Sequence, residues 1–150
     1  MLAELELLYR TRLPQFRRVA AAISGDRDAG RDIVQDAFAT AIRKRRSYRG
    51  QGSLEGWLWA IVVNAARDAR RRRREHDVEP PETAAEERRN GAVPLDLLTD
   101  RQREIVFLHY YADLDYAAIA DALAISPGTV GATLTAARQT LRGALEEVRT

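Results

Sequence analysis

The stretch Ser126–Leu141, SPGTVGATLTAARQTL, decides the fold class of this chain. Ser126 is a favourable N-cap, and Pro127 takes the first helical position, where its missing N–H has no cost. Apolar residues then recur three or four positions apart, on one helix face: Val130, Leu134, Ala137, Leu141 and, further on, Leu145. The stretch therefore predicts the second helix of a helix-turn-helix. Its single charged residue is Arg138, which is unusual for a helix that enters the groove of a polyanion.

Helical periodicity also dominates the rest of the chain, which has 150 residues and is 45% apolar. Further helices are predicted over residues 2–23, about 28–44, 53–75 and 99–110, and on either side of a turn at Ala124–Ser126. Pro14 predicts a kink or a break in the first of these helices. Because clusters of β-branched residues are few, we expect an all-α protein.

Residues 76–94 differ in composition from the segments on either side. They include three prolines and almost no large apolar residue, which is typical of a flexible linker. The linker separates a unit over residues 1–75 from a second unit over residues 95–150. Residues 1–74 carry 17 Lys and Arg against 8 Asp and Glu, whereas residues 95–150 carry 5 against 8. The first unit therefore supplies nearly all of the attraction for a polyanion.

Catalysis, metal binding and membrane insertion find little support in the sequence. It has no Cys and two His, of which His76 falls in the linker and His109 in an apolar helix. Phosphate-binding loops, nucleophile elbows and metal-ligand spacings are absent. No apolar run approaches the ~18 residues of a membrane span, and the N-terminus does not resemble a signal peptide. We therefore expect a cytoplasmic protein that is not an enzyme and has no cofactor.

Basic and aromatic residues gather around a glycine-containing loop, YRGQGS, at residues 48–53. Basic clusters at 43–46 and 70–74 would bind nucleic acid in a salt-dependent way. The alternative interpretation is that these clusters are runs of surface charge that are solvated and bind no nucleic acid. Trp57 and Trp59 lie between these clusters, and aromatic rings suit unstacked bases. Trp57 falls on the predicted apolar stripe of its helix, which favours core packing, whereas Trp59 falls off it. Trp59 is therefore the stronger candidate for a nucleic-acid contact.

Two blocks in this order resemble the extracytoplasmic-function (ECF) group of bacterial sigma-70-type sigma factors. The segment Leu8–Arg73, with DIVQDAF at 32–38 and RDARRRR at 67–73, looks like region 2 of that family. The segment Leu98–Leu145, which contains the helix-turn-helix, looks like region 4. The resemblance covers almost the whole chain. It implies a protein that binds core RNA polymerase, directs it to promoters and helps to melt the −10 element.

The resemblance also implies which residues meet each partner. Those expected on the clamp helices of the polymerase β′ subunit are Asp32, Val34, Gln35, Asp36 and Phe38. Those expected at the −10 non-template strand are Arg45, Tyr48, Arg49, Gly52, Ser53, Trp57, Trp59, Asn64, Arg67, Arg70 and Arg71. The second unit should touch the polymerase β flap and contact the −35 duplex through Arg101, Arg103, Ser126, Gly128, Thr129, Gly131, Ala132, Thr135 and Arg138. Core RNA polymerase and promoter DNA are the expected partners, and an anti-sigma factor is a third candidate.

Several positions depart from the family pattern. Gly30 and Arg31 replace the usual small and acidic pair. Ala60 and Val63 stand where the family often carries basic residues. Ala124 occupies a turn position where Gly is common, and it would cost about 1 kcal/mol if the turn requires a positive φ. The predicted recognition helix also lacks the several Lys or Arg of the family, so its electrostatic hold on DNA is weak.

Because the predicted recognition helix carries so little positive charge, we consider three hypotheses about the function of the chain. The first, which we favour, is a promoter-recognition subunit of RNA polymerase. The second is a stand-alone regulator that uses only the helix-turn-helix, against which the net acidity of residues 95–150 argues. The third is an interaction protein whose second unit contacts another protein through its Ala, Thr and Gly face. If this face meets DNA, Thr135→Arg or Gly131→Lys should raise the affinity for the −35 duplex.

Overall fold

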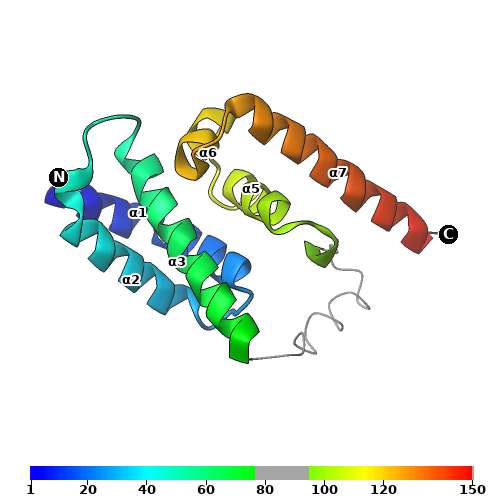
Figure 1. Cartoon of the computed structure of the whole chain (residues 1–150), viewed down its shortest axis with the longest axis horizontal. Coiled ribbons are helices and arrows are strands. Elements are labelled where there is room, and N and C mark those ends of the chain that lie inside the picture. The colour runs from blue at the N-terminus through cyan, green and yellow to red at the C-terminus, as the bar shows by residue number, and fades with distance from the viewer. Residues whose placement is uncertain (77–94, 150) are drawn as a thin grey trace.

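The computed structural model describes residues 1–76 and 95–149, which form two groups of helices (Figure 1). The first group consists of α1 (Leu2–Ser24), α2 (Gly30–Arg43), the 3-10 helix η1 (Arg45–Ser47) and α3 (Leu54–His76). The second consists of the 3-10 helix η2 (Leu95–Leu97), α5 (Asp100–Tyr110), α6 (Tyr116–Leu123) and α7 (Pro127–Arg149). The described residues contain no strand, and the prediction of an all-α protein is confirmed. The predicted linker lies outside the described residues except for His76, which ends α3.

The helices α1, α2 and α3 contact one another around Phe16. The Phe16 ring is fully buried, and it meets Phe38 of α2 edge-on at 5.4 Å and Trp59 of α3 at 4.4 Å between ring centroids. The first residue of α2, Gly30, lets α2 approach α1 closely. A Cβ at Gly30 would lie 2.7 Å from the carbonyl oxygen of Arg17, so a larger residue would force the two helices apart.

Pro14 lies inside α1 without ending the helix. The sequence predicts a kink or a break there, because Pro has no N–H to donate to the carbonyl one turn earlier, at Arg10. In the structure α1 is one continuous helix, and the expected break is therefore wrong. Pro14 and Arg10 are both exposed, so the carbonyl that loses its partner is on the side of the helix where water can replace it.

The second group forms the predicted helix-turn-helix. Thr99 caps α5 with a capping box: its side chain accepts from the N–H of Gln102 at 3.1 Å, and the Gln102 side chain accepts from the N–H of Thr99 at 3.0 Å. The turn after α6 passes through Ala124, which is left-handed at φ 56° and ψ 45°. Ser126 then caps α7, because its Oγ accepts from the N–H of Thr129 at 3.1 Å. At this turn the chain bends by 104°, within the range typical of the motif.

The two groups of helices pack against each other, and their buried residues form one core. In Figure 1, α3 lies beside α6 of the second group, and it contacts α1, α2 and α6. Helix α1 contacts α5 of the second group as well. Arg12 of α1 links the two groups, since it donates to Glu55 Oε1 of α3 and to the carbonyl of Ala112, both at 2.9 Å. One face of α3 is therefore covered by the second group.

Candidate nucleic-acid interface

The glycine-containing loop at residues 48–53 joins η1 to α3. Gly50 and Gly52 have φ angles of 75° and 73°, a conformation that L side chains rarely adopt. Tyr48 fixes the loop, because its hydroxyl donates to the carbonyl of Gly52 at 2.7 Å, and its ring lies 5.5 Å from that of Trp57. Ser53 Oγ accepts a backbone N–H from the first turn of α3 at 2.9 Å. The loop thus places bare backbone beside a pair of half-buried aromatic rings.

The two tryptophans of α3 have the opposite environments from those predicted. Trp59 is fully buried against Phe16, so the expectation that it contacts nucleic acid is wrong. Trp57 is half-buried and stays accessible beside Tyr48. The buried residues of α3 are Gly56, Leu58, Trp59, Val62, Val63 and Ala66, so the apolar face is rotated from the predicted stripe. Trp57 is therefore the tryptophan that a base can reach.

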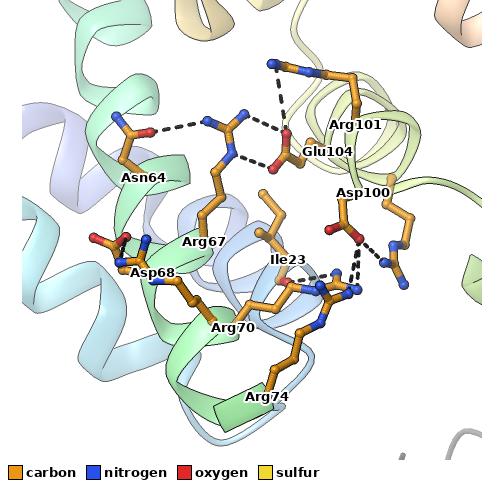
Figure 2. A pocket seen from close by; sticks show the side chains of 11 residues that line it. Ile23, Asn64, Arg67, Asp68, Arg70, Arg74, Asp100, Arg101 and Glu104 are labelled. Carbon is orange, nitrogen blue, oxygen red and sulfur yellow. Dashed lines mark hydrogen bonds and ion pairs between the residues drawn. The ribbon is translucent and has the colours of Figure 1, made fainter.

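Three arginines of α3 meet carboxylates of α5 (Figure 2). Arg67 makes two hydrogen bonds to Glu104, Nε to Oε2 and Nη2 to Oε1, each 2.6 Å long. Arg70 and Arg74 both approach Asp100 Oδ1, at 3.0 and 3.4 Å. The Glu104 side chain is only 7% exposed, so its pair with Arg67 is shielded from solvent on the acidic side. Arg67 and Arg70, which were predicted to hold the −10 strand, are therefore engaged by the second group.

A groove of about 660 Å³ lies at this contact between α3 and α5 (Figure 2). Its charged lining consists of Arg67, Asp68, Arg70, Arg71, Arg74, Asp100, Arg101, Arg103 and Glu104, so positive charge is in excess.

The described residues contain no group of three or more His, Asp or Glu that could hold a metal ion. No single described helix has the length and apolar content to cross a membrane, although α6 and α7 satisfy both criteria as a bent pair.

The mixture of charges in the groove shifts three pKa values. The hydrogen bonds to Glu104 outweigh burial and raise the pKa of Arg67. Burial, together with the charge of Arg103, lowers the pKa of Arg70. Burial would raise the pKa of Asp100, but the hydrogen bond from Arg103 and the charges of nearby arginines outweigh it and lower that pKa. The groove thus stabilises the charged form of Arg67, through Glu104, and disfavours that of Arg70, chiefly through burial.

Asp121 of α6 brings a third carboxylate to the first group of helices. A Cβ placed on Gly52 would lie 3.3 Å from Asp121 Oδ2, and one placed on Gly56 would lie 3.7 Å from Asp121 Cβ. The absence of side chains at these two glycines lets the carboxylate approach the loop and the start of α3. Asp100, Glu104 and Asp121 thus face the surface that was predicted to hold the −10 strand.

Most of the residues predicted to contact the −35 duplex lie on the exposed face of α7. These are Ser126, Gly128, Thr129, Ala132, Thr135 and Arg138. Gly131 is half-buried, and a Cβ there would lie 3.3 Å from Cε2 of Tyr116. Gly131 therefore makes room for the Tyr116 ring, and Gly131→Lys would displace that ring instead of simply adding a free cation. Thr135 is the cleaner position for an added charge.

Arg138, the single charge of the stretch 126–141, is held by an aromatic side chain. Its Nε donates to the hydroxyl of Tyr110 at 3.0 Å, and its guanidinium carbon lies 5.9 Å from the centre of that ring. The bond to Tyr110 raises the pKa of Arg138. Arg101 and Arg103, which were also predicted to contact the −35 duplex, line the groove beside α3. Only Arg138 among these three arginines therefore lies on the α7 face.

The residues predicted to bind polymerase divide into two sets on α2. Asp32, Gln35 and Asp36 are exposed and form one accessible face. Val34 is 0% exposed and Phe38 is 7% exposed, and both belong to the core of the first group. The expectation that Val34 and Phe38 contact a partner is therefore wrong, because helical periodicity turns them inward. Their role is to hold α2 so that the polar face stays outside.

Sequence reasoning missed the residues of the second group that face α3. Asp100, Glu104 and Asp121 were not candidates, and neither was Tyr110, which holds Arg138. The one available signal was the net acidity of residues 95–150 beside the basic first unit. Arg67 and Glu104 are 37 residues apart in the chain, across the predicted linker, so no local spacing could indicate that they pair.

Comparison with protein families agrees with this architecture. Residues 8–76 match the family model of sigma-70 region 2, and residues 95–141 match that of sigma-70, region 4. The chain belongs to the ECF sigma factors of the sigma-70 family. Helices α1 to α3 therefore form region 2, and α5 to α7 form region 4. As a sigma factor, the protein is a transcription initiation factor that binds core RNA polymerase and directs it to promoters.

Individual relatives of this sigma factor match across both regions. The ECF RNA polymerase sigma factor EcfG of Rhodopseudomonas palustris (strain TIE-1) is 29% identical over 145 residues, which cover 89% of this chain and 80% of EcfG. The structure of CnrH in complex with the cytosolic domain of CnrY has a TM-score of 0.76 at 21% identity, over 98% of this chain and 90% of the other. The sigma factor RpoE of Bartonella quintana, in complex with the anti-sigma factor NepR, has a TM-score of 0.71 at 23% identity, over 98% and 99%. Neither region alone makes up that share of the chain, so each of these two structural alignments includes both regions.

Proposed function

We propose that region 2 holds the −10 non-template strand on the surface formed by the glycine loop and α3. The observation that carries this proposal is the accessible Trp57 ring, which lies beside Tyr48 and next to a loop of little side-chain bulk. An unstacked base can lie on such a ring, and every base offers a π-face. The strand's phosphates would meet the polar side chains of this surface: Arg45, Arg49, Ser53, Asn64, Arg67, Arg70 and Arg71.

We further propose that region 4 contacts the −35 duplex with the exposed face of α7. Ser126 and Thr129 lie at the helix N-terminus, where backbone N–H groups favour a phosphate. Ala132 and Thr135 can meet the methyl groups of thymine in the major groove. Because Arg138 is the one charge in the stretch 126–141, region 4 binds weakly by itself. It therefore acts as a tethered element, held on DNA by region 2 and by the polymerase.

The proposed contacts with proteins use other surfaces. Asp32, Gln35 and Asp36 of α2 dock on the clamp helices of the polymerase β′ subunit, and region 4 touches the β flap. Residues 76–94 act as the linker that lets residues 1–75 and 95–150 reach separate promoter elements. An anti-sigma factor is the proposed inhibitory partner, because a sigma factor of the same fold is known in complex with one.

Run-off transcription with reconstituted holoenzyme tests the assignment of Trp57. One stacked base contributes about 1–3 kcal/mol, so Trp57→Ala should lower open-complex formation roughly 5- to 150-fold, whereas Trp57→Phe should keep most of it. Core-enzyme binding, measured in parallel, should be unchanged in both variants. Full open-complex formation by a Trp57→Ala holoenzyme would contradict the proposal.

A further inference from the structure

We propose that Tyr110 of α5 and Arg138 of α7 together bind one backbone phosphate of the −35 duplex, so that Tyr110 is a DNA contact outside the recognition helix. The inference rests on the proposed contact of α7 with that duplex. Tyr110 lies 28 residues before Arg138 in the chain and on another helix, so no local pattern indicates the pair. It gives a second anchor to a helix whose stretch 126–141 carries one charge.

The hydroxyl of Tyr110 is arranged to donate to an anion. Its oxygen accepts from Arg138 Nε at 3.0 Å, so its own proton is not used in that bond and can be given to a third group. A hydroxyl that accepts from a cation is polarised and becomes a stronger donor. The bond takes one N–H of the guanidinium and leaves donors on its terminal nitrogens. Because Tyr110 and Arg138 are both exposed, one phosphate can accept hydrogen bonds from both side chains.

Two further aromatic side chains hold this pair in place. His109 packs edge-on against Tyr110, with 4.8 Å between ring centroids, and its ring lies 5.7 Å from that of Tyr116. The His109 ring is itself fixed, since Nδ1 donates to the carbonyl of Leu114 at 3.1 Å. The pKa of Arg138 is raised chiefly by its bond to Tyr110 and further by Tyr116. Arg138 is thus oriented before DNA arrives, which lowers the entropic cost of binding.

The threonine hydroxyls of α7 are used in a different way. Each of three donates to the backbone carbonyl one turn earlier: Thr133 at 2.7 Å, Thr135 at 3.0 Å and Thr140 at 3.1 Å. A hydroxyl has a single proton, so none of these three can donate to a phosphate while its bond to the helix lasts. Tyr110 therefore supplies a donor that these threonines do not.

The position of the pair favours a phosphate over a base edge. Arg138 is held from α5, so it lies at the border of the α7 face that is proposed to enter the major groove. In a helix-turn-helix the recognition helix meets base edges, whereas the neighbouring helices cross the sugar–phosphate backbone. A donor pair shared between α5 and α7 is therefore placed over the edge of the groove, where phosphates lie.

Binding of the reconstituted holoenzyme to a duplex that it has itself enriched from a random pool tests this assignment. Ethylation interference first identifies the phosphates in contact with the unaltered protein. Tyr110→Phe keeps the ring and removes the hydroxyl, and it should lower the affinity roughly tenfold with an unchanged salt dependence. Arg138→Ala should also lower the affinity, and it should reduce the log–log salt slope by about 0.9. Tyr111→Phe is the matched control, because that neighbouring ring is also exposed but stacks on Phe107.

A neutral methylphosphonate at the phosphate that Tyr110→Phe no longer senses separates DNA contact from stability. A variant with a weakened fold would lose the same factor on the modified and the unmodified duplex. We expect the methylphosphonate to weaken binding by the unaltered holoenzyme, and Tyr110→Phe to cost little more on that duplex. Equal losses on both duplexes, or full affinity of Tyr110→Phe, would overturn this inference alone. A −35 region without any sensitive phosphate would instead refute the proposed contact of α7 with DNA.

Discussion

Replacing Ala124 by Gly should stabilise region 4, although Gly usually weakens helical proteins. Ala124 follows α6 at φ 56° and ψ 45°, where a Cβ costs about 1–2 kcal/mol. Ala124→Gly removes this cost, while the greater freedom of Gly in the unfolded chain returns about 0.4–1 kcal/mol. Since Ala124 is exposed, little packing is lost. The net gain in unfolding free energy is about 0.5–1 kcal/mol, which corresponds to a Tm higher by about 1–4 °C in a chain of this size.

The same substitution elsewhere should have the opposite sign. Ala136 is exposed in the middle of α7, where the backbone is regular helix, and Gly there should cost about 0.5–1 kcal/mol. Thermal melts followed by circular dichroism should therefore show Ala124→Gly above and Ala136→Gly below the unaltered chain. A Tm that falls equally in both variants would refute the reasoning, because it would mean that Ala124 carries no left-handed strain.

Three further outcomes are expected. Trp59→Ala should lower the unfolding free energy by about 3–5 kcal/mol in urea titrations, because the side chain is fully buried; a loss below about 1 kcal/mol would contradict that burial. Thr135→Arg should raise the affinity of the holoenzyme for −35 duplex and steepen its log–log salt dependence by about 0.9, and no change would argue that this face does not meet DNA. Asp100 has a lowered pKa, so its contribution to the contact with α3 is complete above its ordinary pKa of 3.8 and disappears as pH falls through the lower value. Urea titrations of the unaltered chain should therefore show an unfolding free energy that falls in acid over this range, and Asp100→Asn should lack the part of that fall that Asp100 supplies.

Local signals predicted the helix-turn-helix well. Thr99 and Ser126 are caps that act within one turn of their own helices, and the stripe through Val130 and Leu134 needs only the helical period. The concern about Ala124 was also justified, because the turn does require a positive φ. Each of these features depends on residues a few positions apart, which is the range that a sequence pattern reports.

Features that depend on distant neighbours were not predictable in the same way. Helix α3 packs on two sides, so apolar residues cover a wide arc of it, and periodicity alone could not decide which of Trp57 and Trp59 is buried. The role of Gly131 depends on the ring of Tyr116, fifteen residues earlier and on another helix. The expected break at Pro14 failed because the prediction ignored the exposure of that side of α1.

The pairing of Arg67 with Glu104 limits how freely the two regions can be exchanged between sigma factors. A chimera that joins this region 2 to a more basic region 4 would bind the −35 duplex more tightly, but it would lose the acidic surface that pairs with the arginines of α3. The reverse chimera would place Asp100 and Glu104 opposite a helix without matching arginines, leaving a buried carboxylate without a counter-ion. Engineers who recombine promoter specificities from such modules therefore have to exchange α3 and α5 together.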